Sequence, residues 1–183
     1  QVHVLSRRAV PEIKANARLK LHRVDFARLP TAFPAVDDVY IALGTTIKVA
    51  GSEAAFRQVD LEYPRRLAQL TRANGARHFS LVSALGASSK SSVFYSRVNG
   101  ELKDALRAMG WPSLCLLRPS VIAGERQESR PLERVGEWLL RFGPSTYRPV
   151  AAGTIAAAMI ATAQHQAAGV TILESREIPR AAG

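Results

Sequence analysis

The sequence predicts an α/β protein built on a Rossmann-type, doubly wound and mainly parallel sheet. Three observations support this fold class. Short aliphatic and β-branched runs alternate with longer segments of helical periodicity, which is the pattern of a parallel sheet covered by helices. The composition, 47% hydrophobic and 22% charged, is ordinary for a globular protein. The length of 183 residues can bury one substantial core, so we expect a single domain over residues 1–183.

The first part of the chain predicts three strands followed by a long helix. Residues 2–5, 19–24 and 38–43 are the expected strands, because each is an aliphatic or β-branched run that ends at polar or turn residues. The helix begins near Ser52, which can serve as its N-cap, and ends at residues 74–75. Hydrophobic side chains recur along it at helical spacing: Phe56, Val59, Tyr63, Leu67 and Leu70.

The second part of the chain continues the alternation of strands and helices. The expected elements are, in order, strand 78–83, a glycine- and serine-rich loop at 84–92, helix 93–109, strand 113–117, helices 132–142 and 154–164, and strand 170–173. Gly110 lies just past the end of the second helix, where glycine commonly follows a helix. A polar tail completes the chain.

Composition excludes several classes of protein. No apolar run approaches the roughly 18 residues of a membrane span, and the first residues show no signal-peptide pattern. The single cysteine, Cys115, lies in an apolar run and reads as a buried structural thiol, which suits a reducing cytoplasmic location. The net charge of +10 comes from scattered basic residues without a nucleic-acid-binding motif, so we expect no nucleic-acid partner.

Five groups of residues follow predicted strands directly. In open parallel sheets, ligands bind beyond the carboxyl ends of the strands, so these groups should form one cleft. They are Arg7 and Arg8; Asp25 and Phe26; Leu43, Gly44 and Thr45; Ser83; and Pro119 and Ser120.

The strand ends near Arg7 and Gly44 suggest a dinucleotide. Arginine after the strand that reads the adenosine ribose accommodates a 2′-phosphate, since its planar guanidinium donates two parallel hydrogen bonds. A solvated basic turn is the alternative for Arg7 and Arg8. Gly44 has no β-carbon and would let a ligand approach the backbone. An ordinary glycine turn between a strand and a loop explains it equally well.

Ser83 and Tyr95 are the candidate chemical groups. A tyrosine hydroxyl can donate a proton to a carbonyl oxygen, and a serine hydroxyl can polarise the same oxygen. Because the usual tyrosine pKa is about 10, a nearby cation would be needed near neutral pH. Position 99 lies one helical turn after Tyr95, but the neutral Asn99 occupies it. The alternative is a tyrosine that packs under the loop and a serine that caps a strand.

Several stretches along the chain together resemble the atypical short-chain dehydrogenase/reductases. The resemblance is strongest to the branch that contains the Tat-interacting oxidoreductase-like protein and its bacterial relatives. The matching stretches are residues 43–46, 50–53, 76–79, 83–87, 94–101, 117–120 and 126–131.

The resemblance implies NADP(H) binding and a role for each matched residue. Tyr95 corresponds to the family's proton donor and Ser83 to its serine partner, while Asn99 stands at the position of the family's lysine. The resemblance assigns to the cofactor Arg7, Arg8, Leu43, Gly44, Tyr95, Asn99, Ile122 and Arg130. The position after a strand adds the expected cofactor-binding residues Asp25, Phe26, Thr45, Pro119 and Ser120.

The sequence departs from the family pattern in two places. Asn99 cannot lower the tyrosine pKa by charge, which questions turnover more than binding. The family also begins with a strand, a Gly-x-x-Gly-x-x-Gly loop and a helix that bind the pyrophosphate. Residues 1–5 correspond instead to the family's second strand, so we expect an N-terminally incomplete domain that by itself binds the dinucleotide weakly or not at all.

These observations leave two functions open. The first is an NADP(H)-dependent oxidoreductase-like protein that reduces a small carbonyl substrate, with Tyr95 as acid and Ser83 as polarising group. The second is a catalytically weak or inactive cofactor-binding regulator, which Asn99 favours. We expect no metal and no membrane partner. The sequence names neither the substrate nor the oligomeric state.

Overall fold

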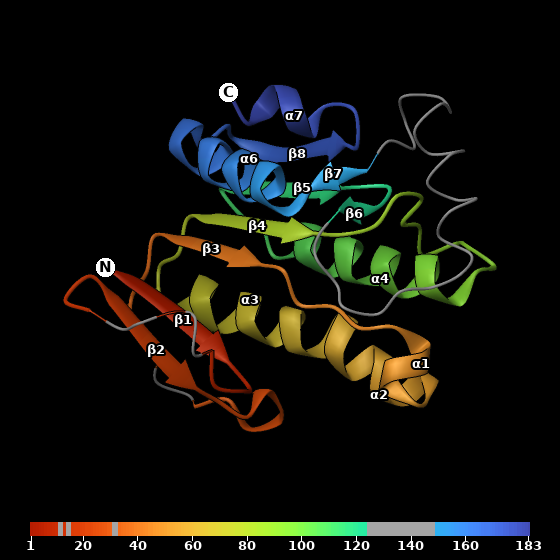
Figure 1. Cartoon of the computed structure of the whole chain (residues 1–183), viewed down its shortest axis with the longest axis horizontal. Helices are drawn as coiled ribbons and strands as arrows, with labels where there is room; N and C mark the ends of the chain where they lie inside the picture. Colours follow the sequence, from red (N-terminus) through yellow and green to blue (C-terminus); the bar gives the residue numbers. More distant parts are fainter. Residues whose placement is uncertain (11–12, 14–15, 31–32, 124–148) are drawn as a thin grey trace. The chain divides into compact units, whose positions relative to one another are not determined.

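The computed structural model describes residues 1–10, 13, 16–30, 33–123 and 149–183 of the chain. These residues divide into two compact units, Gln1–Phe33 and Pro34–Gly183. Figure 1 shows the elements of both units along the chain. The predicted helix at residues 132–142 lies outside the described residues.

The smaller unit is built on two parallel strands. Strand β1 (Val2–Ser6) pairs with β2 (Leu19–Arg23), with Val2 opposite Leu19. The Asn16 carboxamide accepts hydrogen bonds from the backbone N–H groups of Arg18 and Leu19, at 2.9 and 3.1 Å, and so shapes the entry into β2. A short 3-10 helix (Phe26–Arg28) follows. Both strands predicted here are confirmed.

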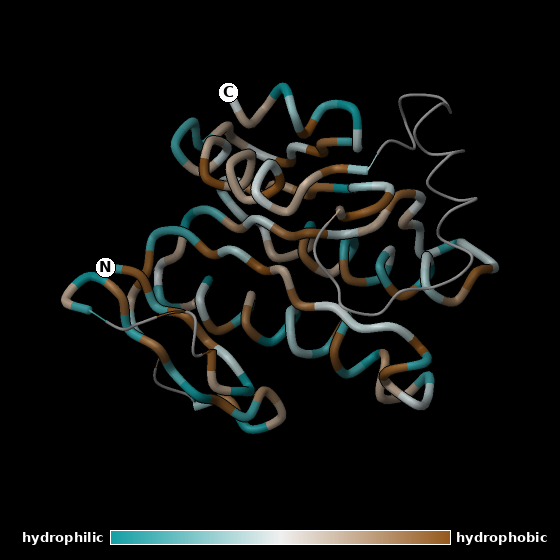
Figure 2. The backbone as a smooth tube through the Cα atoms, in the orientation of Figure 1, coloured by the Kyte–Doolittle hydropathy of each residue, from teal (hydrophilic) through white to brown (hydrophobic). Residues whose placement is uncertain are grey.

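The larger unit contains a four-stranded parallel sheet in the order β3-β4-β5-β8. Its strands are β3 (Asp38–Ile41), β4 (His78–Val82), β5 (Ser113–Arg118) and β8 (Gly169–Glu174). The two central strands, β4 and β5, are almost wholly buried, and Figure 2 shows hydrophobic residues along them. Burial at successive positions is typical of strands with both faces covered.

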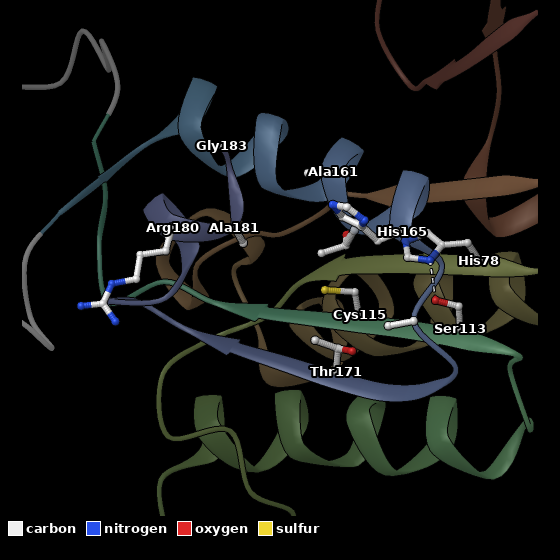
Figure 3. Close-up of a pocket in the computed structure, with 11 residues that line it drawn as sticks. His78, Ser113, Cys115, Ala161, His165, Thr171, Arg180, Ala181 and Gly183 are labelled. Atoms are coloured by element: carbon white, nitrogen blue, oxygen red, sulfur yellow. Dashed lines mark hydrogen bonds between the residues drawn. The ribbon is translucent and has the colours of Figure 1, made fainter.

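Helices cover both faces of this sheet. Helix α4 (Phe94–Ala108) lies on one face and α6 (Ala152–His165) on the other, as Figures 1 and 3 both show. Helix α3 (Tyr63–Ala73) contacts α4 and β3, while α7 (Ile178–Ala181) packs on α6. The doubly wound arrangement predicted from the sequence is confirmed. None of the helices in the described ranges combines the length and apolarity needed to cross a membrane.

The predicted helix at residues 52–75 is an interrupted one. It consists of α2 (Glu53–Arg57), a π-helical turn (Gln58–Glu62) and α3, and a short helix α1 (Ile47–Ala50) precedes it. Ser52 is the N-cap of α2, as predicted, and its Oγ accepts the N–H of Ala55 at 3.1 Å. Thr46 caps α1 in the same way through the N–H of Val49, at 3.2 Å.

Pro64 explains the π turn physically. Proline has no N–H to donate, and its ring clashes with the carbonyl group four residues earlier, which here belongs to Asp60. A regular α-helix cannot accommodate this clash. The wider turn relieves it, and the N–H of Tyr63 bonds to the carbonyl of Gln58, five residues back.

The remaining predictions differ from the structure mainly in their bounds. Helix α4, helix α6, and strands β5 and β8 lie where they were expected, within two residues at each end. Several short elements escaped sequence analysis: the 3-10 helix, α1, β6 (Ile122–Ala123), which pairs in parallel with β7 (Val150–Ala151), and α7 in the predicted polar tail. Elements of two to four residues contain too few positions to show a period.

Candidate functional site

A cleft of about 750 Å³ opens beyond the carboxyl ends of β3, β4 and β5. This volume is within the usual range for small-molecule and cofactor sites. The loops that follow these strands line the cleft, together with residues of α4 and α6. It gathers many of the residues selected from the sequence: Leu43, Gly44, Thr45, Ser83, Tyr95, Asn99, Pro119, Ser120 and Ile122.

The other predicted site residues are not among those that line this cleft. Arg7 and Arg8 are exposed residues of the smaller unit. Asp25 caps the 3-10 helix, because its Oδ1 accepts the N–H of Ala27 at 2.9 Å, and Phe26 is buried. Arg130 lies outside the described residues. Their roles in cofactor binding remain predictions.

The turn after β3 is held by a buried carboxylate. Asp60, which is 7% exposed, accepts the backbone N–H of Thr45 through Oδ2 at 2.9 Å. A β-carbon on Gly44 would meet Asp60 Oδ1 at 3.6 Å, an ordinary contact. The fold would therefore tolerate alanine at Gly44, which leaves close approach of a ligand as a reason for glycine there.

Asp60 escaped the sequence analysis. Its position four residues after Phe56, on the buried side of an amphipathic helix, was the available signal, since an acidic residue rarely occupies such a place without a partner. Burial raises the pKa of Asp60 to about 6, and the hydrogen bond from Thr45 opposes this rise.

Ser83 follows β4 directly and is well buried. It is 8% exposed, and its N–H donates to the carbonyl of Leu117 at 2.7 Å, which fixes the backbone against β5. Within the described part of the chain, Ser83 Oγ has no hydrogen-bond partner. A buried hydroxyl without a partner is costly, so a ligand in the cleft would satisfy it.

Tyr95 lies in the first turn of α4 and reaches the same cleft. Its ring packs against Phe56 with centroids 5.7 Å apart, and 43% of the residue is exposed. Desolvation raises the pKa of Tyr95, and the negative charge of Asp60 raises it further. The environment therefore keeps the phenol protonated near neutral pH.

Asn99 is turned back onto its own helix. It is 6% exposed, and its Nδ2 donates to the carbonyl oxygen of Tyr95 at 3.0 Å. The side chain lines the cleft as predicted but brings no positive charge to the tyrosine.

A second, smaller cavity of about 270 Å³ lies at the amino ends of β4 and β5 (Figure 3). There His78 Nδ1 and Ser113 Oγ are 2.9 Å apart, and burial lowers the pKa of His78, which favours neutral imidazole. Cys115 is buried, as predicted, and burial raises its pKa, so it is a thiol rather than a nucleophilic thiolate. No group of residues suited to a metal ion occurs in the ranges that the structure describes.

Comparison with known proteins identifies homologues of the chain. No family model matches the chain. Protein HTATIP2 of Rattus norvegicus is 37% identical over 145 residues, which cover 77% of this chain and 58% of that protein. The mitochondrial protein fmp52 of Emericella nidulans is 31% identical over 131 residues, covering 71% of this chain and 56% of that protein. Both relatives are homologues of this chain and are consistent with an atypical short-chain dehydrogenase/reductase. The chain spans somewhat more than half the length of these two relatives.

Solved structures confirm the Rossmann-like fold of the chain. MoeE5 in complex with UDP-glucose and NAD has a TM-score of 0.70 at 14% identity, covering 93% of this chain and 66% of that one. A UDP-galactose 4-epimerase gives 0.67 at 14% identity, over 94% and 68%. RMD from Pseudomonas aeruginosa complexed with NADPH gives 0.60 at 16% identity, over 91% and 73%. These likenesses show the Rossmann-like fold alone.

One prediction from the sequence is wrong. We expected a cytoplasmic location from the absence of a signal peptide and the single cysteine. The fungal relatives from Emericella nidulans, Aspergillus terreus and Aspergillus niger are named as mitochondrial proteins, which points away from the cytoplasm. The error arose because one cysteine and an apolar composition suit any reducing compartment.

Proposed function

We propose that the chain forms the cofactor-binding part of an NADP(H)-dependent oxidoreductase-like protein that reduces a small carbonyl substrate. One observation carries the proposal: a single cleft gathers the Gly44–Thr45 turn, the unpartnered Ser83 hydroxyl and the Tyr95 phenol. The relatives support the family, and fold neighbours were solved with NAD or NADPH bound.

The residues of the cleft suit a nicotinamide dinucleotide. The exposed Gly44 leaves the backbone open to a flat or extended ligand, and Leu43, Pro119 and Ile122 offer apolar contacts. Arg7 and Arg8 would bind the 2′-phosphate, which would select NADP(H) over NAD(H). Asp25, Phe26, Thr45, Ser120 and Arg130 complete the proposed cofactor-binding set.

Two hydroxyl groups would act on the substrate. When bound, the reduced cofactor supplies a hydride to the carbonyl carbon. Ser83 Oγ would donate a hydrogen bond to the carbonyl oxygen and polarise it. The Tyr95 hydroxyl would transfer its proton to that oxygen, because its environment keeps the phenol protonated. Asn99 would hold the backbone carbonyl of Tyr95 without assisting proton release.

A specific observation also favours the second function, a cofactor-binding regulator with little or no turnover. The family's lysine is replaced by Asn99, and the nearest described charge that acts on Tyr95 is the carboxylate of Asp60. Both features leave the tyrosine a weak acid, and among the described residues no positive charge acts to stabilise its anion.

Binding and turnover of the intact protein separate these functions. NADPH and NADH binding would be measured by calorimetry, and carbonyl reduction would be assayed for the wild type and for Asn99→Lys. We expect NADPH to bind more tightly than NADH. An ammonium at position 99 should lower the Tyr95 pKa and raise kcat with little change in the Kd for NADPH. Wild-type turnover supports the oxidoreductase, and turnover confined to the variant supports the regulator. If neither NADPH nor NADH binds, both proposed functions are refuted.

A further inference from the structure

Asp60 is a buried carboxylate that neither the family motif nor the proposed chemistry assigns. It lies in the middle of the π turn at Gln58–Glu62, and this turn packs against α4, the helix that carries Tyr95. Single π turns within α-helices often occur at functional sites, because they redirect one side chain out of the regular helical pattern. Here the redirected carboxylate lines the cleft.

We propose that Asp60 is a positioning residue of the reductase site, which fixes the Gly44–Thr45 turn and places a negative charge in the cleft that Tyr95 also lines. This inference rests on the proposed function, because it assigns to Asp60 the placement of groups that would meet the dinucleotide and the carbonyl.

The first part of the inference rests on hydrogen bonding. Thr45 N–H donates to Asp60 Oδ2 at 2.9 Å, and both residues line the cleft. The carboxylate is 7% exposed and joins a loop to a helix 15 residues later in the chain. A charged acceptor makes a stronger bond than a neutral one. The backbone surface at Gly44 is thereby held in one conformation before a ligand arrives.

The second part rests on the charges around the π turn. Two ion pairs lie around it: Arg57 of α2 with Glu101 of α4 at 2.7 Å, and Arg65 of α3 with Glu62 of the π turn at 2.6 Å. Asp60 and Tyr95 line the same cleft, and the carboxylate raises the pKa of Tyr95 in addition to the effect of desolvation. A phenol is protonated near neutral pH even at its usual pKa of about 10, so the charge acts on Tyr95 by disfavouring the tyrosinate anion.

Three variants of the intact protein test both parts. Asp60→Ala removes the acceptor and the charge, and Asp60→Asn removes the charge but keeps an oxygen that can accept from Thr45. Glu62→Gln is the control, since it neutralises a carboxylate of the same turn whose partner is Arg65. Amide hydrogen exchange at Thr45 reports the anchor, and NMR titration of the tyrosine rings, assigned with Tyr95→Phe, reports the phenol.

The expected results differ for each variant. Asp60→Ala should speed Thr45 exchange and weaken dinucleotide binding, each about tenfold or more. Asp60→Asn should keep the Thr45 exchange rate and the dinucleotide Kd within about threefold of the wild type, because it loses only the charge of the hydrogen-bond acceptor. Both variants should lower the Tyr95 pKa, and Glu62→Gln should change none of these quantities.

Two outcomes would overturn the inference. One is an unchanged Tyr95 pKa in Asp60→Asn, and the other is unchanged Thr45 exchange in Asp60→Ala. If Asp60→Ala does not fold, Asp60→Asn still decides the charge effect. Both readouts need no ligand, so they remain valid if the wild type binds no dinucleotide. A wild type that binds no dinucleotide would refute the proposed function and would leave Asp60 a structural residue only.

Discussion

Tyr95 experiences one carboxylate and no described cation at the position where the family has a lysine. Asp60 raises its pKa, and the neutral Asn99 does not oppose this rise. A protonated phenol can act as an acid. The tyrosinate anion, which would act as the base, is disfavoured. Under the proposed function, the site should favour reduction of a carbonyl, which needs an acid, over oxidation of an alcohol, which needs a base.

The raised pKa of Asp60 predicts a pH-dependent stability difference. The pKa rises from 3.8 to about 6 in the folded protein, so the native state holds this proton more tightly than the unfolded state. Wild-type stability from this group is therefore full below pH 4 and is lost as the pH rises to about 6. Relative to Asp60→Asn, the wild type should lose up to about 3 kcal/mol between these pH values.

Urea unfolding of both proteins at pH 4, 5, 6 and 7 would measure this difference, because other titrating groups cancel in the comparison. A difference in unfolding free energy that stays constant across this range would show that Asp60 titrates normally.

At the scale of elements, the loop at residues 84–92 and helix α4 approach each other unusually closely. A β-carbon on Gly100 would lie 2.1 Å from the backbone of Ser88 and Ser89. Arg118 also holds the loop, because it donates to the carbonyl of Ala87 at 3.2 Å and pairs with Glu174 at 3.0 Å. The loop that carries residues after Ser83 is thus held between α4 and β8.

Replacing Gly100 with alanine should therefore destabilise the protein, although alanine is the better helix former. The methyl group would overlap backbone atoms that cannot rotate away, which should cost about 2–4 kcal/mol. Thermal unfolding would measure the loss. Gly153→Ala in the first turn of α6 is the matched control, because nothing lies within 4 Å of a β-carbon there, and its stability should not fall.

The sequence predicted the elements with strong periodicity and missed those set by single residues. Strand β5 has an apolar run from Leu114 to Leu117, β4 is rich in hydrophobic residues, and α4 shows helical spacing over 15 residues, so these elements were recognisable. The π turn depends on one proline and its clash with one carbonyl, which a periodicity analysis averages out. Asp60 was missed for another reason: helical spacing from Phe56 places it on the buried side, but its partner, the N–H of Thr45, lies 15 residues earlier in the chain.

At the scale of the whole chain, the rule for parallel sheets located the candidate site. Residues after β3, β4 and β5 meet in one cleft, as their places at the carboxyl ends required. The strands of the smaller unit are followed by Arg7, Arg8, Asp25 and Phe26. For these residues, a place in the cofactor site stays a prediction. A contact between residues distant in sequence, such as Asp60 with Thr45, needed coordinates.

The proposed roles of Arg7 and Arg8 predict which cofactor the protein prefers. Replacing Arg7 and Arg8 together with alanine should weaken NADPH binding about tenfold or more, because each guanidinium can make charge-assisted bonds to a 2′-phosphate. NADH binding should change less than about threefold, since NADH lacks this phosphate. Calorimetry with both dinucleotides would measure the ratio. The exposed pair Arg65 and Arg66 on α3 provides the control for net charge. Equal losses for NADPH and NADH would contradict the assignment.

The π turn also has a consequence for aligning this chain with distant homologues. Structurally it is a one-residue insertion within a helix, and the side chains before and after it differ in phase by about 100° from a regular helix. A homologue with an uninterrupted helix should need a gap at residues 58–62. If the gap is placed elsewhere, Asp60 is compared with a solvent-facing position, and its acidic counterparts go unrecognised.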